Sequence, residues 1–294
     1  MRFQKITIVG VGLLGGSIGL GARRRGLARE VAGFVRRAAS LKDCERAGAV
    51  DYATTDLLAA VSQADLVILC TPLAQMRSRV EEMLPAIKRG AIVTDVGSVK
   101  AGIVREVCGI IRKAGAHFVG SHPMAGAEKT GVWAAREDLF ENAICVVTPT
   151  KNTNPAALQK VERFWKSLGG RTLRLTPQLH DQLVSRSSHL PHVAAAALAN
   201  LVLNPANPQT QLQLCASGFR DATRIASGSP EMWRDIALAN RKNLSRALDA
   251  FVAELQKFQR VLKTSDARAV AKFFESAKSR RDSWCAGSAP TSSE

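Results

Sequence analysis

Two residues whose side chains can hold or move a proton follow apolar, strand-like runs of the sequence. Ser98 comes after the run 91–96, and His122 comes after the run 116–120, within Gly-Ser-His-Pro-Met-Ala-Gly. Because the carboxyl ends of parallel strands meet at one edge of a sheet, we expect both side chains in one crevice. A neutral imidazole can take a proton from a substrate hydroxyl as a hydride leaves the adjacent carbon. Ser98 would hydrogen-bond the same oxygen or orient the imidazole, and we expect His122 to be exposed in its glycine-flanked loop.

The start of the chain predicts a hydride acceptor for this chemistry. The apolar run 6–9 is followed at once by Gly-Val-Gly-Leu-Leu-Gly, a G-x-G-x-x-G, and then by a helical pattern over 14–25. A strand that turns on glycines into a helix presents backbone N–H groups and a positive helix end to a pyrophosphate. A purely structural glycine turn is the alternative. The residues expected to contact a dinucleotide are Gly10, Gly12, Leu13, Leu14 and Gly15, with Thr71 and Pro72 after the run 65–70.

The end of the second strand-like run, 30–35, indicates which dinucleotide is bound. An acidic residue there would hydrogen-bond the ribose 2′-hydroxyl of NAD, but this run is followed by Arg36 and Arg37. Two guanidinium groups favour a 2′-phosphate, so we expect NADP rather than NAD. A solvated basic turn is the alternative interpretation of the two arginines.

These residues need a scaffold, and the spacing of the apolar runs predicts one. Strand-like runs alternate with helical segments, which is typical of βαβ units and a parallel sheet. We therefore expect an α/β Rossmann-type, doubly wound, mostly parallel sheet over 1–175 and an all-α domain over 176–282, with helices at 180–203, 210–226 and 231–263. The segment 283–294 is small and polar, and we expect it to be disordered. The strands are expected at 6–9, 30–35, 65–71, 91–96, 116–120, 143–148 and 171–175, and the helices between them at 14–25, 57–62, 74–88, 100–114 and 155–168.

The last predicted helix carries a seam of apolar residues spaced 4, 3, 4, 3 and 4 apart. Such a seam packs inside one chain or against a second subunit, and on a single long helix we favour a homodimer formed through the helical domain. The seam consists of Leu244, Leu248, Phe251, Leu255, Phe258 and Leu262.

The charge and composition of the sequence indicate which kinds of partner, such as nucleic acid, a membrane or a metal ion, the protein is expected to have. The 294 residues carry a formal charge of +16, and the segment 241–281 holds eleven Lys or Arg. No aromatic interleaving or nucleic-acid motif accompanies these charges, so a solvated helix face is favoured over a nucleic-acid surface. The six cysteines are scattered without a C-x-x-C, no leader peptide is recognisable, and the longest apolar run, 193–203, is too short to span a membrane. We expect a cytoplasmic protein without a metal site, since the five histidines form no H-E-x-x-H.

Six segments of the sequence, read together, resemble the prephenate/arogenate dehydrogenases of tyrosine biosynthesis. They occur in the family's order from residue 10 to residue 236 and read GVGLLGGSIG, TPL, DVGSVK, GSHPMAG, HDQLVSRSSHLPH and GFRDATRIASGSPEMWRDI. The resemblance implies a Rossmann domain joined to a helical dimerisation domain. It also implies oxidation of a cyclohexadienol that loses its ring carboxylate as CO2. The chain departs from the NAD-type members of the family at Val35-Arg36-Arg37, and this departure favours NADP.

The resemblance also implies roles for individual residues. His122 would accept a hydrogen bond from the ring hydroxyl with support from Ser98, and Arg224 would bind a substrate carboxylate with His192 near the substrate side chain. The acidic positions near the pocket entrance would be Glu128 and Asp221, and the lining residues Arg220 and Trp233. His180 is assigned a structural role, as most single histidines are.

Several alternatives stay open from the sequence. One is a non-catalytic NADP-binding sensor or nucleic-acid-binding regulator. Another is a two-domain dehydrogenase of the β-hydroxyacid type. The sequence does not choose between arogenate and prephenate as substrate, and it does not indicate whether tyrosine inhibits.

Overall fold

The computed structural model describes residues 2–127 and 129–287. By their contacts these residues form two compact units, 1–244 and 245–294, and each is described by itself. The first unit contains the sheet and the helices that follow it up to residue 239. The domain boundaries expected at 175 and 282 stay a prediction.

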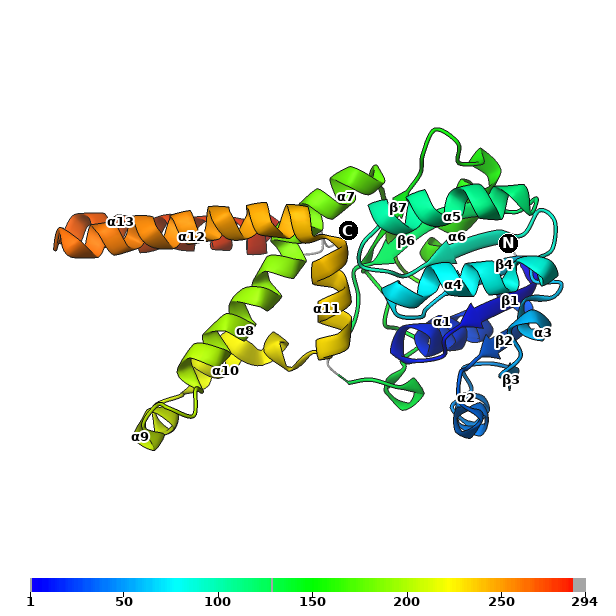
Figure 1. The fold of residues 1–294 in the computed structure, drawn as a ribbon, viewed down its shortest axis with the longest axis horizontal. Coiled ribbons are helices and arrows are strands. Elements are labelled where there is room, and N and C mark those ends of the chain that lie inside the picture. Colours follow the sequence, from blue (N-terminus) through cyan, green and yellow to red (C-terminus); the bar gives the residue numbers. More distant parts are fainter. Residues whose placement is uncertain (1, 128, 288–294) are drawn as a thin grey trace, which may run out of the picture. The chain divides into compact units, whose positions relative to one another are not determined.

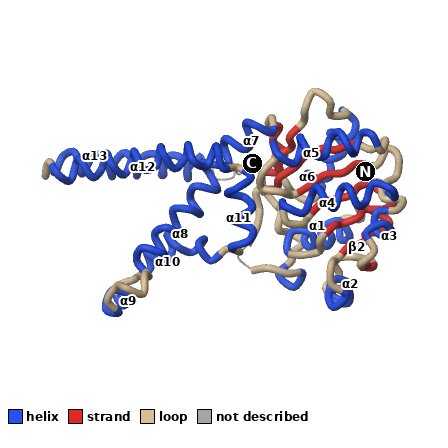
Figure 2. Tube along the Cα trace, viewed as in Figure 1, coloured by secondary structure: helices blue, strands red, loops and turns tan. Residues whose placement is uncertain are grey.

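One eight-stranded sheet, with strand order β3-β2-β1-β4-β5-β6-β7-β8, forms the centre of the first unit (Figures 1 and 2). All neighbouring strands pair in parallel except β6 and β7, which are antiparallel, so the expected mostly parallel, Rossmann-type sheet is confirmed. The short strand β3 was not predicted, and β6 runs three residues beyond its expected end. The strands are β1 (Phe3–Val9), β2 (Ala28–Phe34), β3 (Tyr52–Thr54), β4 (Leu66–Leu69), β5 (Ile92–Asp95), β6 (His117–Pro123), β7 (Ile144–Thr148) and β8 (Arg171–Arg174).

Helices cover both faces of the sheet and enclose two apolar cores. On one face α1 (Leu13–Arg24) and α6 (Pro155–Ser167) pack with the strands around a fully buried pair of aromatic rings, Phe164 and Trp165. On the other face α3 (Leu57–Val61), α4 (Leu73–Met83) and α5 (Ala101–Lys113) bury aliphatic side chains. Burial on both faces fixes the sheet, and with it the positions of the residues at the strand ends. The short helix α2 (Leu41–Arg46) precedes β3.

The helical segments after β8 are more broken than the sequence predicts. The helix expected over 180–203 is interrupted by a π-helical turn, Ser185–His189, because Pro191 has no N–H to continue the regular ladder. The helix expected over 231–263 breaks at Asn240, whose side-chain amide turns into the interior instead of towards solvent. The helices of this part are α7 (Pro177–Val184), α8 (Leu190–Val202), α9 (Gln209–Gln213), α10 (Ser217–Thr223) and α11 (Pro230–Ala239).

The second unit is built from two helices. α12 (Arg241–Lys263), which begins at the end of the first unit, and α13 (Ala267–Gly287) are joined by a short turn, and Phe258 packs against Phe273 with ring centroids 4.7 Å apart. Part of the predicted apolar seam, including Leu255 and Leu262, is exposed in the single chain.

The C-terminal tail differs from its prediction in part. Residues 283–287, expected to be disordered, continue α13, because the helical pattern persists past the i,i+4 ion pair of Lys278 and Asp282. The rest of that expected tail, 288–294, lies outside the described residues. Among the helices that the structure describes, none is both long enough and apolar enough to cross a membrane.

Candidate active site

The glycine loop meets the backbone requirements of a dinucleotide site. Gly10 adopts a φ of +102°, and a Cβ there would lie 2.9 Å from the carbonyl oxygen of Cys70. A Cβ on Gly15 would overlap the carbonyl oxygen of Gly10, so this glycine permits the close packing of α1 on β1. A Cβ on Gly12 would meet no protein atom within 4 Å. These are the three glycine roles of the fingerprint: a tight turn, an open approach for the ligand, and helix–strand packing.

A pocket of about 260 Å³, the nucleotide pocket, opens beside this loop. Five of the residues predicted to bind the cofactor line it: Gly10, Gly12, Arg36, Thr71 and Pro72. The other predicted residues, Leu13, Leu14, Gly15 and Arg37, are not among the lining residues, and the Arg37 side chain is exposed. Sequence reasoning missed the rest of the lining, which is Val11, Phe34, Val35, Ser40, Cys70, Gln75 and Arg79.

The nucleotide pocket is positively charged where β2 ends. Arg36 lines it from the residues after β2, and Arg79 lines it from α4. The guanidinium of Arg79 lies 5.6 Å from the centroid of the Phe34 ring and is ion-paired with Glu82. No acidic residue lines the pocket among the residues that the structure describes.

His122 is more deeply placed than the sequence predicts. It lies within β6, opposite Val146 of β7, and its exposed fraction is 7%. The expectation of an exposed loop is therefore wrong, because pairing with β7 extends the strand to Pro123. Burial, followed by the nearby His180, Lys100 and His189, holds the pKa of His122 well below its usual value of 6.5. The imidazole is neutral at pH 7 and is able to accept a proton.

A chain of hydrogen bonds runs from His122 into α7. Its Nδ1 lies 2.9 Å from Nε2 of His180, and Nδ1 of His180 lies 2.8 Å from Oδ1 of Asp181. The Asp181 carboxylate also accepts the backbone N–H groups of Lys100 at 2.7 Å and Ala101 at 2.9 Å, at the start of α5. The sequence had marked His180 only as structural, and its one signal was the adjacent acid in His-Asp.

A buried ion pair supports this part of the sheet. Lys100 and Asp95 are both fully buried and paired, and Lys100 Nζ also donates to the carbonyl oxygen of Ser121 at 2.8 Å. Asp95 accepts the backbone N–H groups of Ser121 at 3.1 Å and Gly97 at 2.9 Å. Burial lowers the pKa of Lys100, while the charge of Asp95 raises it. The pair thus ties the end of β5 to β6, next to His122.

Ser98 lies between the two members of this pair in the sequence and is half-buried. Within the described residues, the hydrogen-bond partner of Nδ1 of His122 is Nε2 of His180 and not Ser98. His180 is thus the described side chain that contacts this ring nitrogen, and the role of Ser98, towards the substrate oxygen or towards the imidazole, stays a prediction.

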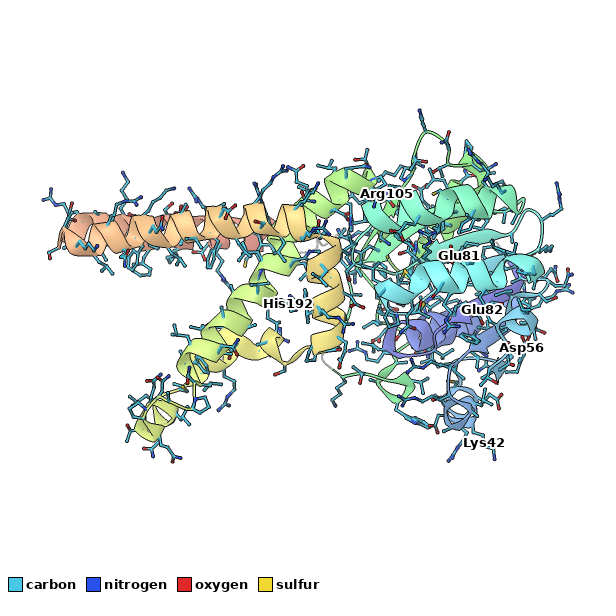
Figure 3. All side chains as sticks on the ribbon, viewed as in Figure 1. Lys42, Asp56, Glu81, Glu82, Arg105 and His192 are labelled. Carbon is cyan, nitrogen blue, oxygen red and sulfur yellow. The ribbon has the colours of Figure 1, made fainter. Side chains whose placement is uncertain are left out.

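A second group of aromatic side chains lies between α8 and α11. His192, labelled on α8 in Figure 3, stacks on Trp233 with ring centroids 3.7 Å apart, and its Nδ1 donates to the carbonyl oxygen of Ser188 at 2.9 Å. Burial lowers the pKa of His189 to about 4. The amide of Asn240 lies 3.2 Å from Nδ1 of His189 and donates to the carbonyl oxygen of Asp181 at 2.8 Å.

The remaining predicted substrate residues lie on α10 and just after it. Arg220 and Asp221 are exposed on α10, and Arg224 is exposed at the start of the following 3-10 turn. Glu128 lies outside the described residues. The roles of these residues stay predictions. Within the described ranges, no cluster of three or more His, Cys, Asp or Glu side chains could hold a metal ion.

Two family models match the chain: the nucleotide-binding domain of prephenate dehydrogenase over residues 18–174 and the dimerization domain of prephenate dehydrogenase over residues 176–276. A prephenate dehydrogenase of Bacillus subtilis is 34% identical over 94% of this chain and 75% of its own length. A cyclohexadienyl dehydrogenase of Zymomonas mobilis is 32% identical over 95% of both chains. The crystal structure of prephenate dehydrogenase from Aquifex aeolicus in complex with hydroxyphenyl propionate and NAD+ superposes with a TM-score of 0.90, at 32% identity, over 96% of this chain and 99% of the other.

Proposed function

The chain belongs to the prephenate dehydrogenase family, and from this premise we propose that it oxidatively decarboxylates prephenate, arogenate or both, with NADP as the preferred hydride acceptor. The observation that carries the proposal is the neutral, buried imidazole of His122 at the sheet edge that also carries the glycine loop. A proton acceptor and a dinucleotide site at one edge are what removal of H⁻ and H⁺ from a ring alcohol requires.

In this proposal His122 is the proton acceptor. Its Nε2 receives the hydrogen bond of the ring hydroxyl and takes the proton as the carbon–oxygen bond becomes a carbonyl. Loss of the ring carboxylate as CO2 then leaves its electron pair in the ring and gives an aromatic phenolate, which takes the proton back from His122, so the reaction is strongly downhill. When bound, the nicotinamide supplies the hydride-accepting carbon. The protein's task is to align the ring carbon and to hold a neutral base next to its hydroxyl.

The preference for NADP is supported by the charges of the nucleotide pocket. Arg36 and Arg79 line it, and a 2′-phosphate carries the charge that two guanidinium groups complement. The Aquifex aeolicus relative was crystallised with NAD+, so the proposal of NADP is based only on the residues of this chain. Gly10, Gly12, Thr71 and Pro72 would hold the remaining parts of the dinucleotide.

Substrate binding is proposed on the resemblance to the family. Arg224 binds a substrate carboxylate, and His192, held by its stacking on Trp233, lies near the substrate side chain. Asp221, Glu128 and Arg220 belong to the pocket entrance and wall. The dimerization-domain match and the exposed leucines of α12 support a homodimer, and we propose a cytoplasmic location.

The test is a steady-state assay of the purified chain with prephenate and arogenate, each with NADP+ and NAD+. We expect formation of NADPH at 340 nm with stoichiometric release of CO2, and a higher kcat/KM with NADP+ than with NAD+. No reduction of either nucleotide with either substrate would contradict the proposal. Salt-dependent DNA binding without turnover would support the alternative of a regulator.

A further inference from the structure

We propose that His180 and Asp181 are positioning residues that hold His122 in the tautomer with its proton on Nδ1 and its lone pair on Nε2. This inference deepens the proposed function and rests on it, because it assigns the device that prepares His122 as a base. It concerns two residues of α7: His180, which the sequence analysis treats only as structural, and Asp181, to which it assigns no role.

The tautomer follows from the end of the chain of hydrogen bonds. The Asp181 carboxylate takes two backbone N–H groups from the start of α5, so it is an ionised acceptor. In this proposal His180 carries one proton, on the Nδ1 that faces Asp181, and its Nε2 is left as an acceptor. Nδ1 of His122, 2.9 Å from that atom, must donate to it.

The remaining nitrogen of His122 is therefore the one that carries a lone pair. No described residue hydrogen-bonds Nε2 of His122, and the 7% of the side chain that stays exposed leaves it open to a ligand. If the tautomer were reversed, Nε2 would carry a hydrogen, and the substrate hydroxyl would meet a donor instead of a base. A neutral imidazole in solution populates both tautomers. The hydrogen bonds to His180 and Asp181 select the one tautomer of His122 that can accept the substrate proton.

The series of hydrogen bonds is held rigidly at Asp181, the end that lies away from His122. His180 is 0% exposed and Asp181 is 3% exposed. The carbonyl oxygen of Asp181 accepts the amide of Asn240, so residue 181 is fixed through both its side chain and its backbone. The same carboxylate faces the imidazolium that forms when His122 takes the substrate proton, and its charge stabilises that state through His180. Both effects act in the reaction and not in binding.

A direct test observes the tautomer without substrate. In protein labelled with ¹⁵N-histidine, the five histidines are resolved by NMR, and the His122 signals are assigned by their loss in His122→Asn. We expect Nδ1 of His122 to have a protonated, pyrrole-type shift and Nε2 an unprotonated, pyridine-type shift from pH 6 to 8. A protonated Nε2 in the wild type would overturn the proposal.

A kinetic test uses two replacements of His180 that differ in one property. His180→Gln keeps an oxygen that can accept from Nδ1 of His122, and His180→Met removes the acceptor while keeping a similar length. We expect kcat to fall on the order of 10²-fold in His180→Met and less in His180→Gln, with KM and the Kd of NADP+ within about twofold of wild type. Asp181→Asn should also lower kcat, but it removes charge from the start of α5, so it is the secondary variant.

The outcomes separate this inference from the proposed function. If the wild type turns over neither substrate, the proposed function fails while the NMR result still stands by itself. If the wild type is active and His180→Met keeps full kcat with a folded, unchanged melting curve, the positioning role fails and the function survives. Equal losses in His180→Gln and His180→Met, matched by equal losses of melting temperature, would reduce His180 to a packing residue and overturn the inference.

Discussion

The nucleotide pocket and the chain of His122, His180 and Asp181 begin at the same edge of the sheet, but they are built from different groups. The pocket presents bare backbone at its glycine loop and at the start of α1, and arginine side chains at its rim. The hydrogen-bonded series of His122, His180 and Asp181 is formed by titratable side chains that are almost fully buried. The glycine loop can approach a ligand because its side chains are missing. The hydrogen-bonded residues around His122 depend on having specific side-chain partners.

This difference determines how each region responds to change. A rim arginine can be removed with little effect on packing, so changes there should alter which cofactor binds. A buried polar group that loses its partner keeps its desolvation cost, so changes around His122 should affect rate and stability together. Four predictions test this division, and their expected effects decrease in order.

The largest effect is expected from His122→Asn. The amide cannot take a proton, so kcat should fall by about 10²- to 10⁴-fold, the range for loss of a general base. The measurement is kcat with saturating NADP+ and substrate. The control is the Kd of NADP+, which should be unchanged because His122 does not line the nucleotide pocket. Near-wild-type turnover would remove His122 from its proposed role.

The second prediction concerns the buried pair of Lys100 and Asp95. Lys100→Met leaves the Asp95 carboxylate fully buried without its cation, and the free energy of unfolding should fall by about 3–5 kcal/mol. The measurement is urea unfolding at pH 7. Adding Asp95→Asn to this variant removes the unpaired charge, and part of the loss should be recovered.

A matched control for that pair lies in the residues that precede β4 and β5. Lys88 and Asp65 form an ion pair whose side chains are 39% and 25% exposed, and water screens their charges. Lys88→Met should therefore cost less than about 1 kcal/mol. Equal losses in the Lys88 and Lys100 variants would show that burial does not set the energetics of these pairs.

The fold was predictable because it follows from a periodic pattern of apolar residues in the sequence. Apolar runs bounded by glycines and prolines locate seven of the eight strands, and βαβ spacing gives the parallel sheet. The breaks at 185–189 and Asn240 were missed, because the local sequence is helical there and the break comes from tertiary contacts of Asn240 and from Pro191. Propensity contains no information on such contacts.

The site was predictable only in part, for a related reason. Motif positions gave His122, the glycine loop and Arg36, since each lies at or just after the end of a strand. His180 was missed because its partner lies 58 residues away and only the fold brings the two together. Arg79 was missed in the same way, since α4 brings it to the end of β2. Contacts between side chains of different helices and strands depend on how those elements pack, and the pattern of a single sequence does not predict them.

The third prediction tests the pocket side of the comparison. Arg36→Ala should weaken NADP+ by about 10- to 100-fold, the value of a charge-assisted hydrogen bond to phosphate, and NAD+ by less than about twofold. Arg37→Ala is the matched control, because Arg37 is exposed and does not line the pocket, and it should change neither affinity by more than about twofold. The measurement is calorimetric titration with both nucleotides. Equal weakening of NADP+ and NAD+ by Arg36→Ala would contradict the assignment of the 2′-phosphate.

The smallest effect expected in any single comparison is the pH dependence of stability from a buried histidine, measured over one half-unit step of pH. Burial lowers the pKa of His189 to about 4, below its usual 6.5. Between these two values the unfolded chain binds a proton that the folded chain does not, so the free energy of unfolding must decrease as the pH falls from 6.5 towards 4. One such histidine contributes up to about 1.4 kcal/mol per pH unit in this window and nothing above it.

The variant that isolates this contribution is His189→Gln, whose amide oxygen can still accept from Asn240. Carboxylates that titrate in the same window are common to both proteins, so they cancel when the two slopes are subtracted. Urea unfolding at half-unit steps from pH 7.5 to 4.5 should give parallel behaviour above 6.5 and a steeper loss for the wild type below it. Coincident slopes would mean that the folded protein protonates His189 as readily as the unfolded chain does. His189 would then not behave as a buried side chain whose environment disfavours its charged form, and the contrast between the pocket and the buried polar side chains would not hold for this residue.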